Sequence, residues 1–528
     1  MSQQQRSYDI LFDGQLRPGF DEQQVRLNLA TEFGFSAEEI DDIFGGGSVI
    51  LYHQGQQAEA LTMRQSFTRA GLMVRIEANV DAEAELSAQD PKGARAADLE
   101  PAALAAKFAT PLEGEPPSRG YQMRLWGVAG ATLLLPILYG EFLLVMALLL
   151  ASHFAQLPSL WLSPDGSWVM GLVALALAIV GLLLLLIALK PLVALYNRPE
   201  RIPVTAEEQP RLFSLLSYLC HYLQVPIPDR VQVDSEVHVT VGLAHGWRGL
   251  FDRKLALTVG LPVAGGLNAR HFVGALAHEF GHFSQRGALE AYCIINGVNA
   301  WLYRRAHRSD RLDDWFQEWF AEHRGSQWAR GLNRAYNTGK KLARGIFGLM
   351  FQLSLTINQS LSRHMEFEAD KQVLQTVGTE AFKPIALSLY AMAYAAREAN
   401  AVNGRVIEQR NLFSNLPAAI VRRFNHYSQD DWHAFESQTQ KIKTRAWDFH
   451  PADRERIERA MATAVPGVFH YEGPASQLFS EFDALCIEAT TSHYLHWGIE
   501  DPDEFVIANE QIFVTLGPNW GGPREIEE

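Results

Sequence analysis

The chain has 528 residues, which is too long for one ordinary domain and suggests roughly two to four. Its composition, 48% hydrophobic and 20% charged, excludes a disordered or fibrous protein, and its net charge of −14 argues against nucleic-acid binding through a broad basic face. The three cysteines are odd in number and far apart, which argues against a disulfide framework or a cysteine zinc cluster and favours a reducing compartment.

Residues 1–80 are expected to form a small cytoplasmic α/β module of order β-α-α-β-α-β, with strands at 8–12, 48–53 and 72–77. Ser36 and Glu39 have the spacing of a capping box, and Gly71 is placed to end the third helix. Residues 1–118 contain 9 Lys and Arg against 19 Asp and Glu. This acidic surface is either an ordinary solvated face or a docking site for a protein partner.

Residues 81–118 are rich in Ala, Glu and Pro and are expected to be a flexible linker. A transmembrane hairpin is then predicted over residues 119–196, with spans at about 125–151 and 168–189. The only ionisable side chain in either span is Glu141. Both stretches reach the length of about 20 residues that crosses a bilayer.

The charges beside the two spans predict their orientation. Arginines precede the first span and Lys190 follows the second, whereas the connection from Ser152 to Ser167 contains neither Lys nor Arg. The positive-inside rule therefore places both termini and the following domain of this multi-pass protein in the cytoplasm.

Residues 197–465 are expected to form one mainly helical domain, followed by a C-terminal extension over 466–528. Strands are predicted at 231–233 and 255–259, with a further extended segment at 237–241. Asn268 can cap a helix that continues through Ser284. The fold class is thus an α+β multidomain membrane protein.

The first group of candidate catalytic and metal-binding residues is the H-E-x-x-H motif His278-Glu279-Phe280-Gly281-His282, which lies on the predicted helix. A separation of four residues puts His278 and His282 on one helical face, where both imidazoles can bind one Zn²⁺. Glu279 can then take a proton from water at the metal. Alone, the motif also fits a surface helix with two incidental histidines.

A second motif reduces that ambiguity. The segment from Ser362 to Asp370 reads SRHMEFEAD, and Glu366 is suited to be a third ligand because catalytic zinc commonly takes two His and one Glu. Asp370, one helical turn further on, can accept the ring N–H of a ligating histidine. Glu368 should point away from the site, since it lies about 200° around the helix from Glu366.

Three features follow one another along the chain, namely a two-span hairpin, HEFGH and SRHMEFEAD. This order resembles that of the integral-membrane zinc metallopeptidases that include bacterial HtpX and the CAAX prenyl endopeptidases. The resemblance covers roughly residues 120–465 and implies a zincin-type metallopeptidase domain with one Zn²⁺ per chain. That family usually has a later His-Pro pair followed by an arginine, which His450, Pro451 and Arg456 match. By resemblance His450 lies near the substrate carbonyl. Alternatively, this segment only caps a helix beside the site.

The chain also departs from that family. The stretch 236–242 lacks the usual Asn-Ala pair of the substrate-binding edge, although it remains suited to an extended strand. Residues 345–357 are too few for a third span. The surrounding region is either a segment resting on the inner leaflet or an ordinary helical insertion, and contains Trp301, Arg304, Arg305, Arg308, Arg311, Trp315 and Trp319.

The sequence therefore predicts a membrane-anchored zinc endopeptidase that cleaves polypeptides. By resemblance, its substrates are misfolded membrane proteins and its role is quality control. Two alternatives remain: a noncatalytic membrane scaffold or regulator with a metallopeptidase fold, and a zinc hydrolase of small or prenylated peptides.

Overall fold

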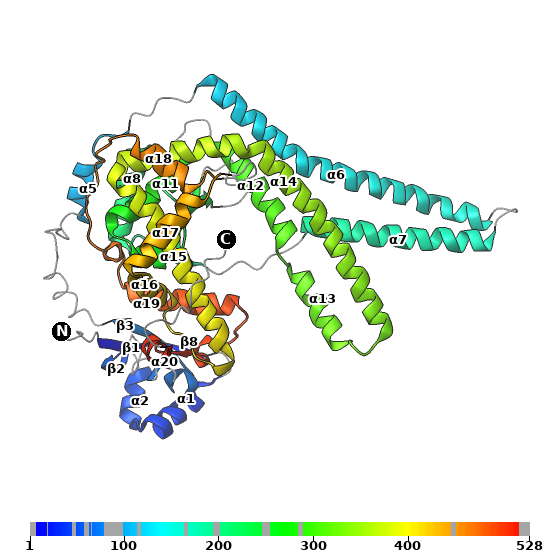
Figure 1. The fold of residues 1–528 in the computed structure, drawn as a ribbon. Coiled ribbons are helices and arrows are strands. Elements are labelled where there is room, and N and C mark those ends of the chain that lie inside the picture. Colours follow the sequence, from blue (N-terminus) through cyan, green and yellow to red (C-terminus); the bar gives the residue numbers. More distant parts are fainter. Residues whose placement is uncertain are drawn as a thin grey trace.

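The computed structural model describes every residue except 1–6, 18–19, 45–48, 57–62, 65, 79–98, 113–117, 163–166, 194–200, 245–253, 284–288, 445–449 and 517–528. The protein is mostly helical, with a few small sheets (Figure 1). Two of the described helices are long and apolar enough to cross a membrane. They form a hairpin that projects away from the rest of the molecule (Figure 1).

The N-terminal module has the predicted strands. β1 (Ser7–Leu16) is the central strand and pairs antiparallel with β2 (Val49–Gln56) and β3 (Leu72–Ala78). The helices α1 (Glu22–Asn28) and α2 (Ala37–Phe44) cover the sheet with a π-helical turn at Leu29–Phe33 between them. The Ser36 and Glu39 capping box forms, and Gly71 has φ +106°, a conformation in which any Cβ would also collide with Phe20.

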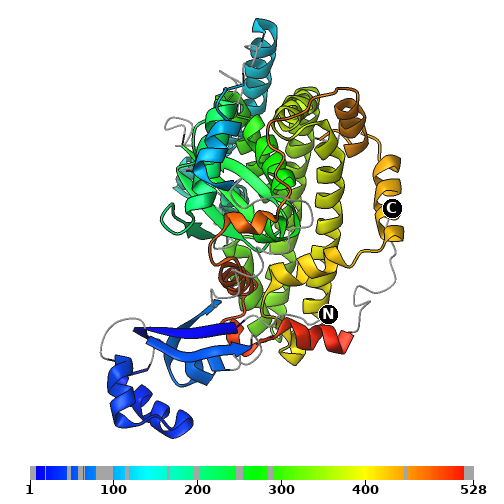
Figure 2. The same cartoon turned by 90° about the vertical axis from the view of Figure 1, so that its left-hand side faces the viewer.

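This module packs against the C-terminal end of the chain. Ala508 belongs to the core of the module, and Arg17 and Arg64 each lie 2.7 Å from an aspartate, Asp501 and Asp503. Figure 2 shows the blue N-terminal strands beside the red C-terminal helix α20 (Asn509–Leu516). The first and last parts of the sequence therefore form one unit.

The segment expected to be a flexible linker contains a helix. α5 (Pro101–Lys107) packs against α8 (Pro210–Leu223), and Leu99, Leu104 and Phe108 are buried in the main core. The prediction of a linker over 81–118 is wrong for these residues, because burying three large apolar side chains fixes the segment to the domain. Residues 81–98 lie outside the described part of the chain.

The hairpin consists of α6 (Arg119–Leu162) and α7 (Trp168–Val193). The hydroxyl of Tyr139 donates to the carbonyl of Ala188, and His153 contacts the carbonyl of Ala174. These two contacts imply an antiparallel register in which the uncharged stretch 168–189 lies beside residues 138–159 of α6. The expected span at 125–151 overlaps this stretch only over residues 138–151, and the expected loop from Ser152 is still helix as far as Leu162.

The N-terminal third of α6 has a different environment from the rest of the hairpin. It packs against α12 (Leu289–His307) and α14 (Gln327–Val377), with Leu125 and Ala129 buried among their side chains. At the same level the buried Thr132 hydroxyl donates to Asn358 of α14 over 2.8 Å. This part of α6 therefore packs as part of the domain.

The domain beyond the hairpin is built on a four-stranded sheet of order β4-β5-β7-β6. Its strands are β4 (Ile202–Val204), β5 (Arg230–Asp234), β7 (Leu255–Gly260) and β6 (Val239–Leu243). β6 is an edge strand that pairs antiparallel with β7. The helices α8, α10 (Leu261–Gly266), α11 (Ala269–Gly281) and α15 (Thr379–Val406) pack around this sheet in the main core.

The expected boundary after residue 465 does not interrupt this core. Phe469 and Leu478 are fully buried in it, and α19 (Phe482–His496) contributes Leu485 and Cys486. The remaining elements are α13 (Arg311–Glu322), β8 (Leu412–Phe413), α16 (Leu416–Asn425), α17 (Gln429–Lys441), α18 (Asp453–Met461) and β9 (Val506–Ile507). The C-terminal extension is thus part of the domain and also contacts the N-terminal module.

The register of the hairpin predicts which cysteines water-soluble reagents can reach. In open membrane fragments we expect Gly127→Cys to react with a charged maleimide, because residue 127 lies beyond the end of the lipid-facing stretch. Leu149→Cys should be protected, since Leu149 is exposed on the hairpin where lipid would surround it. The three native cysteines are buried and give little background. Protection at both positions would contradict the register.

Candidate metal centre

The H-E-x-x-H motif lies at the end of α11. The Asn268 side chain accepts from the backbone N–H of His271 and so fixes where this helix begins. The apolar residues of α11, among them Phe272, Leu276 and Phe280, are fully buried. Their burial holds the helix against the sheet and directs His278 and His282 toward α14.

The two helices that carry the site touch closely. A Cβ at Gly281 would lie 2.9 Å from the backbone Cα of Ala369 on α14, closer than real Cβ atoms come. Only glycine therefore permits this approach without a shift of one helix. Gly281 directly precedes His282, and Ala369 lies between Glu366 and Asp370 on α14. The contact between Gly281 and Ala369 therefore sets the distance between the two halves of the site.

Three side chains of this site could hold a metal ion. The ligand atoms of His278, His282 and Glu366 all lie within 4.8 Å of one another. The Glu366 oxygens are 3.3 Å from His278 Nε2 and 3.6 Å from His282 Nε2. Ligands about 2.1 Å from a tetrahedral Zn²⁺ lie about 3.4 Å apart, so the donor types and these two spacings fit zinc.

A carboxylate and an arginine support His278 from behind. Asp370 Oδ1 lies 3.1 Å from His278 Nδ1, and Arg456 on α18 donates to both Asp370 oxygens over 2.6 and 3.0 Å. When Nε2 is a metal ligand, Nδ1 must carry the ring proton and donate it to Asp370. Arg456 also lies 3.3 Å from His278 Nδ1, but two N–H donors cannot form a hydrogen bond with each other. Arg456 therefore acts by fixing Asp370 in place.

Glu279 faces the edge strand β6. Its carboxylate accepts a hydrogen bond of 3.3 Å from the backbone N–H of Val241 on β6. The backbone groups of His238 and Ala244 form hydrogen bonds on the β7 side of the strand. Because the direction of these groups alternates along a strand, the backbone groups of residues 239, 241 and 243 point to the free edge of the sheet. The strand lies two residues later than the extended segment expected at 237–241.

His450 also reaches the site. Its Nδ1 lies 2.8 Å from Glu366 Oε1, while 62% of its side chain is exposed. The structure thus brings together all seven residues that the sequence singled out, namely His278, Glu279, His282, Glu366, Asp370, His450 and Arg456. Glu368 points away and pairs with Lys371 at the surface, as predicted.

The carboxylates of the site attract positive charge. Burial alone would lower the pKa of His278, but hydrogen bonds with Asp370 and Glu366 raise it to about 9. Burial alone would raise the pKa of Glu366, but hydrogen bonds with His278 and His450 lower it below its ordinary value. Burial and the neighbouring His278 lower the pKa of His282 to about 3, so this ring is neutral at pH 7, as a metal ligand must be. Burial also raises the pKa of Glu279, which favours its use as a base.

Sequence reasoning missed one side chain beside the donor set. Tyr292 of α12 stacks on the His282 ring, with centroids 5.2 Å apart and planes at 12°. The His282 Nδ1 atom has no hydrogen-bond partner among the described residues. No motif links a tyrosine ten positions further on to H-E-x-x-H, so only the packing of α12 beside α11 shows this contact.

Comparisons with known proteins add nothing to this geometry: no family model, curated protein or solved structure matches the chain. The resemblance to membrane zinc metallopeptidases therefore rests on the motifs, their order and the site itself.

The Arg456–Asp370 pair predicts a specific effect on metal affinity. Arg456→Lys keeps the charge but loses the two-pronged contact, so Asp370 holds His278 less firmly. We expect the affinity for Zn²⁺, measured by competition with a chromogenic chelator, to fall by about 10- to 100-fold. Arg454→Lys is the matched control, because Arg454 is paired only at the surface with Glu458. Equal affinities in the two variants would contradict the positioning role of Arg456.

Proposed function

We propose that this protein is a membrane-anchored, zinc-dependent endopeptidase. The observation that carries the proposal is the convergence of two histidines and a glutamate from two helices, with the Glu279 carboxylate beside them and a free strand edge next to that carboxylate. A metal-binding scaffold without catalysis has no use for either of the last two features. We therefore favour an enzyme over the scaffold alternative.

In this proposal His278, His282 and Glu366 hold one Zn²⁺ per chain. When bound, zinc lowers the pKa of a water molecule and polarises the carbonyl of the peptide bond to be cut. Glu279 accepts the proton of the attacking water and later donates it to the leaving amine. Its raised pKa suits the first step, because a more basic carboxylate accepts the proton of water more readily.

The substrate would lie extended along β6. The backbone groups of Val239, Val241 and Leu243 at the free edge can pair with a peptide strand. Because Val241 also donates to Glu279, a peptide held at this edge has its backbone close to the base. In this mode the protein recognises the backbone of the substrate, so polypeptides of many sequences can bind. This favours endopeptidase activity over hydrolysis of small peptides.

The location follows from the hairpin and its charges. We place the hairpin in a bacterial inner membrane with both termini and the catalytic domain in the cytoplasm, because Lys190 and the arginines of α12 lie at the domain end of the hairpin. A site beside the membrane surface, together with the resemblance to HtpX-like peptidases, favours misfolded membrane proteins as substrates and quality control as the role.

Replacing the proposed base tests the mechanism. In Glu279→Gln the amide cannot accept the proton, so kcat/KM for an unfolded labelled casein should fall by about 10²- to 10⁴-fold. Zinc content should stay unchanged, since Glu279 is not a ligand. Mass spectrometry of the wild-type products should show internal cuts.

Glu368→Gln provides the matched control, because Glu368 lies two residues from the ligand Glu366 but points to the surface. It should retain wild-type activity. Full activity of Glu279→Gln would overturn the mechanism, and release of terminal residues alone would point to an exopeptidase instead.

A further inference from the structure

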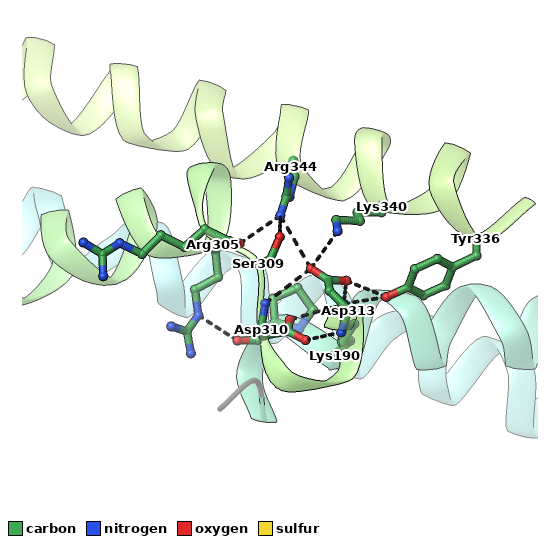
Figure 3. A network of polar contacts seen from close by, with 10 residues as sticks. Lys190, Arg305, Ser309, Asp310, Asp313, Tyr336, Lys340 and Arg344 are labelled. Carbon is green, nitrogen blue, oxygen red and sulfur yellow. Dashed lines mark hydrogen bonds and ion pairs between the residues drawn. The ribbon is translucent and has the colours of Figure 1, made fainter. Parts of the chain in front are cut away.

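A charged cavity lies where the membrane hairpin meets the domain. Lys190 is the first charged residue of α7 after 22 uncharged residues, and it points into a cluster of polar side chains from α13 and α14 (Figure 3). Asp310 and Asp313 both pair with Lys190. The cavity has a volume of about 40 Å³, room for about three water-sized groups.

The carboxylate of Asp313 is fully engaged within this cluster. Besides Lys190, it accepts from the Tyr336 hydroxyl over 2.5 Å, and it lies 3.0 Å from Lys340 and 3.5 Å from Arg344. Burial alone would raise its pKa, but the hydrogen bonds from Lys190, Tyr336 and Lys340 lower it to about 2. Asp313 is therefore charged at neutral pH and holds the basic side chains together.

The cavity nevertheless has more positive than negative charge. Its lining contains five basic side chains and two carboxylates, namely Lys190, Arg305, Arg308, Lys340 and Arg344 against Asp310 and Asp313. Arg305 donates to the carbonyl of Pro191, and the other four basic side chains still outnumber the two carboxylates. The cavity therefore has positive charge that an anion from outside can neutralise. Phosphate is the anion that clustered Lys and Arg bind best, because it accepts several charge-assisted hydrogen bonds at once.

The depth of the cavity points to the source of that phosphate. Lys190 directly follows the uncharged stretch of α7 that is long enough to cross the hydrocarbon core, so it lies at the level of the lipid headgroups. α14 touches α7 there, since a Cβ at Gly339 would lie 3.1 Å from Ile187. Figure 1 shows α13 and the first half of α14 diverging obliquely from the hairpin, so that they form an arm beside it.

An apolar stripe begins beside the cavity. Leu342, Ile346, Leu349 and Leu353 of α14 are 65%, 41%, 68% and 51% exposed, and their spacing places them along one side of the helix. Large exposed apolar side chains in this arrangement suit a membrane interface beside the cavity.

We propose that the cavity lined by Lys190, Arg308, Lys340 and Arg344 binds the phosphate of an anionic phospholipid of the cytoplasmic leaflet. Bound lipid would fix the arm against the membrane, and with it the long helix that carries Glu366. The inference rests on the membrane placement proposed above and is independent of proteolysis.

The test uses the full-length protein in nonionic detergent, titrated calorimetrically with dihexanoyl phosphatidylglycerol. We expect saturable binding of one lipid per cavity, with weaker or no binding of dihexanoyl phosphatidylcholine and of inorganic phosphate. The double variant Lys340→Gln/Arg344→Gln should bind phosphatidylglycerol at least about tenfold more weakly, because two charged phosphate contacts are lost. The double variant Arg330→Gln/Arg334→Gln removes the same charge from exposed positions of α14 that do not line the cavity, and should bind normally.

Equal losses in the two double variants would show diffuse attraction and overturn the site. Equal affinity for inorganic phosphate would assign the cavity to a free anion, and absence of phosphatidylglycerol binding would also contradict the proposal. Because Lys340 and Arg344 hold Asp313, their replacement can loosen the arm. Arg308→Gln, which leaves the Asp313 contacts intact, should then still lower the affinity several-fold, and wild-type affinity in that variant would overturn the proposal.

Discussion

The close contact between α11 and α14 is the constraint on which the candidate site depends. His278 and His282 lie on one helix and Glu366 on the other, and a shift of either helix by a methyl-sized distance would separate the nitrogen and oxygen ligands. Gly281 permits the contact, and Ala369 opposite it has a small side chain that is fully buried. Because interiors are tightly packed, neighbouring buried side chains resist such a shift. The metal geometry is therefore a consequence of helix packing as much as of the motif.

The same helix α14 links the site to the membrane hairpin. Its 51 residues extend about 77 Å and include the basic side chains at the hairpin, Phe347 and Asn358 against α6, and then Glu366 and Asp370. One helix of this length therefore connects the candidate site directly to the hairpin. The N-terminal third of α6 makes a second connection, since it packs on α12 and α14. The domain that carries the candidate site is thus braced against the hairpin by two helices.

Much of the site could be predicted from the sequence because its parts are local patterns. A separation of four residues places His278 and His282 on one helical face in any helix, and a second carboxylate-bearing helix completes a known zinc ligand set. The N-terminal strands were also predictable, since a sheet with one buried face alternates apolar and polar residues. Gly71 and the Ser36 capping box are equally local signals.

The features that were missed depend on contacts between distant residues. Hydropathy cannot distinguish a helix face buried by protein from one exposed to lipid, so it did not reveal that the first part of α6 packs on α12 and α14. Leu99, Leu104 and Phe108 lie in a polar, alanine-rich stretch whose partner, α8, lies about 110 residues away. The role of Arg456 follows from its pairing with Asp370, 86 positions earlier, which no periodicity reveals.

Metal analysis of the purified full-length protein tests the central claim most directly. The account predicts about one zinc ion per chain in the wild type and in the surface variant Glu368→Gln, and loss of that zinc in His278→Ala and in Glu366→Gln. A wild-type protein without stoichiometric zinc, or zinc retained by both ligand variants, would contradict the metal centre and the peptidase mechanism built on it.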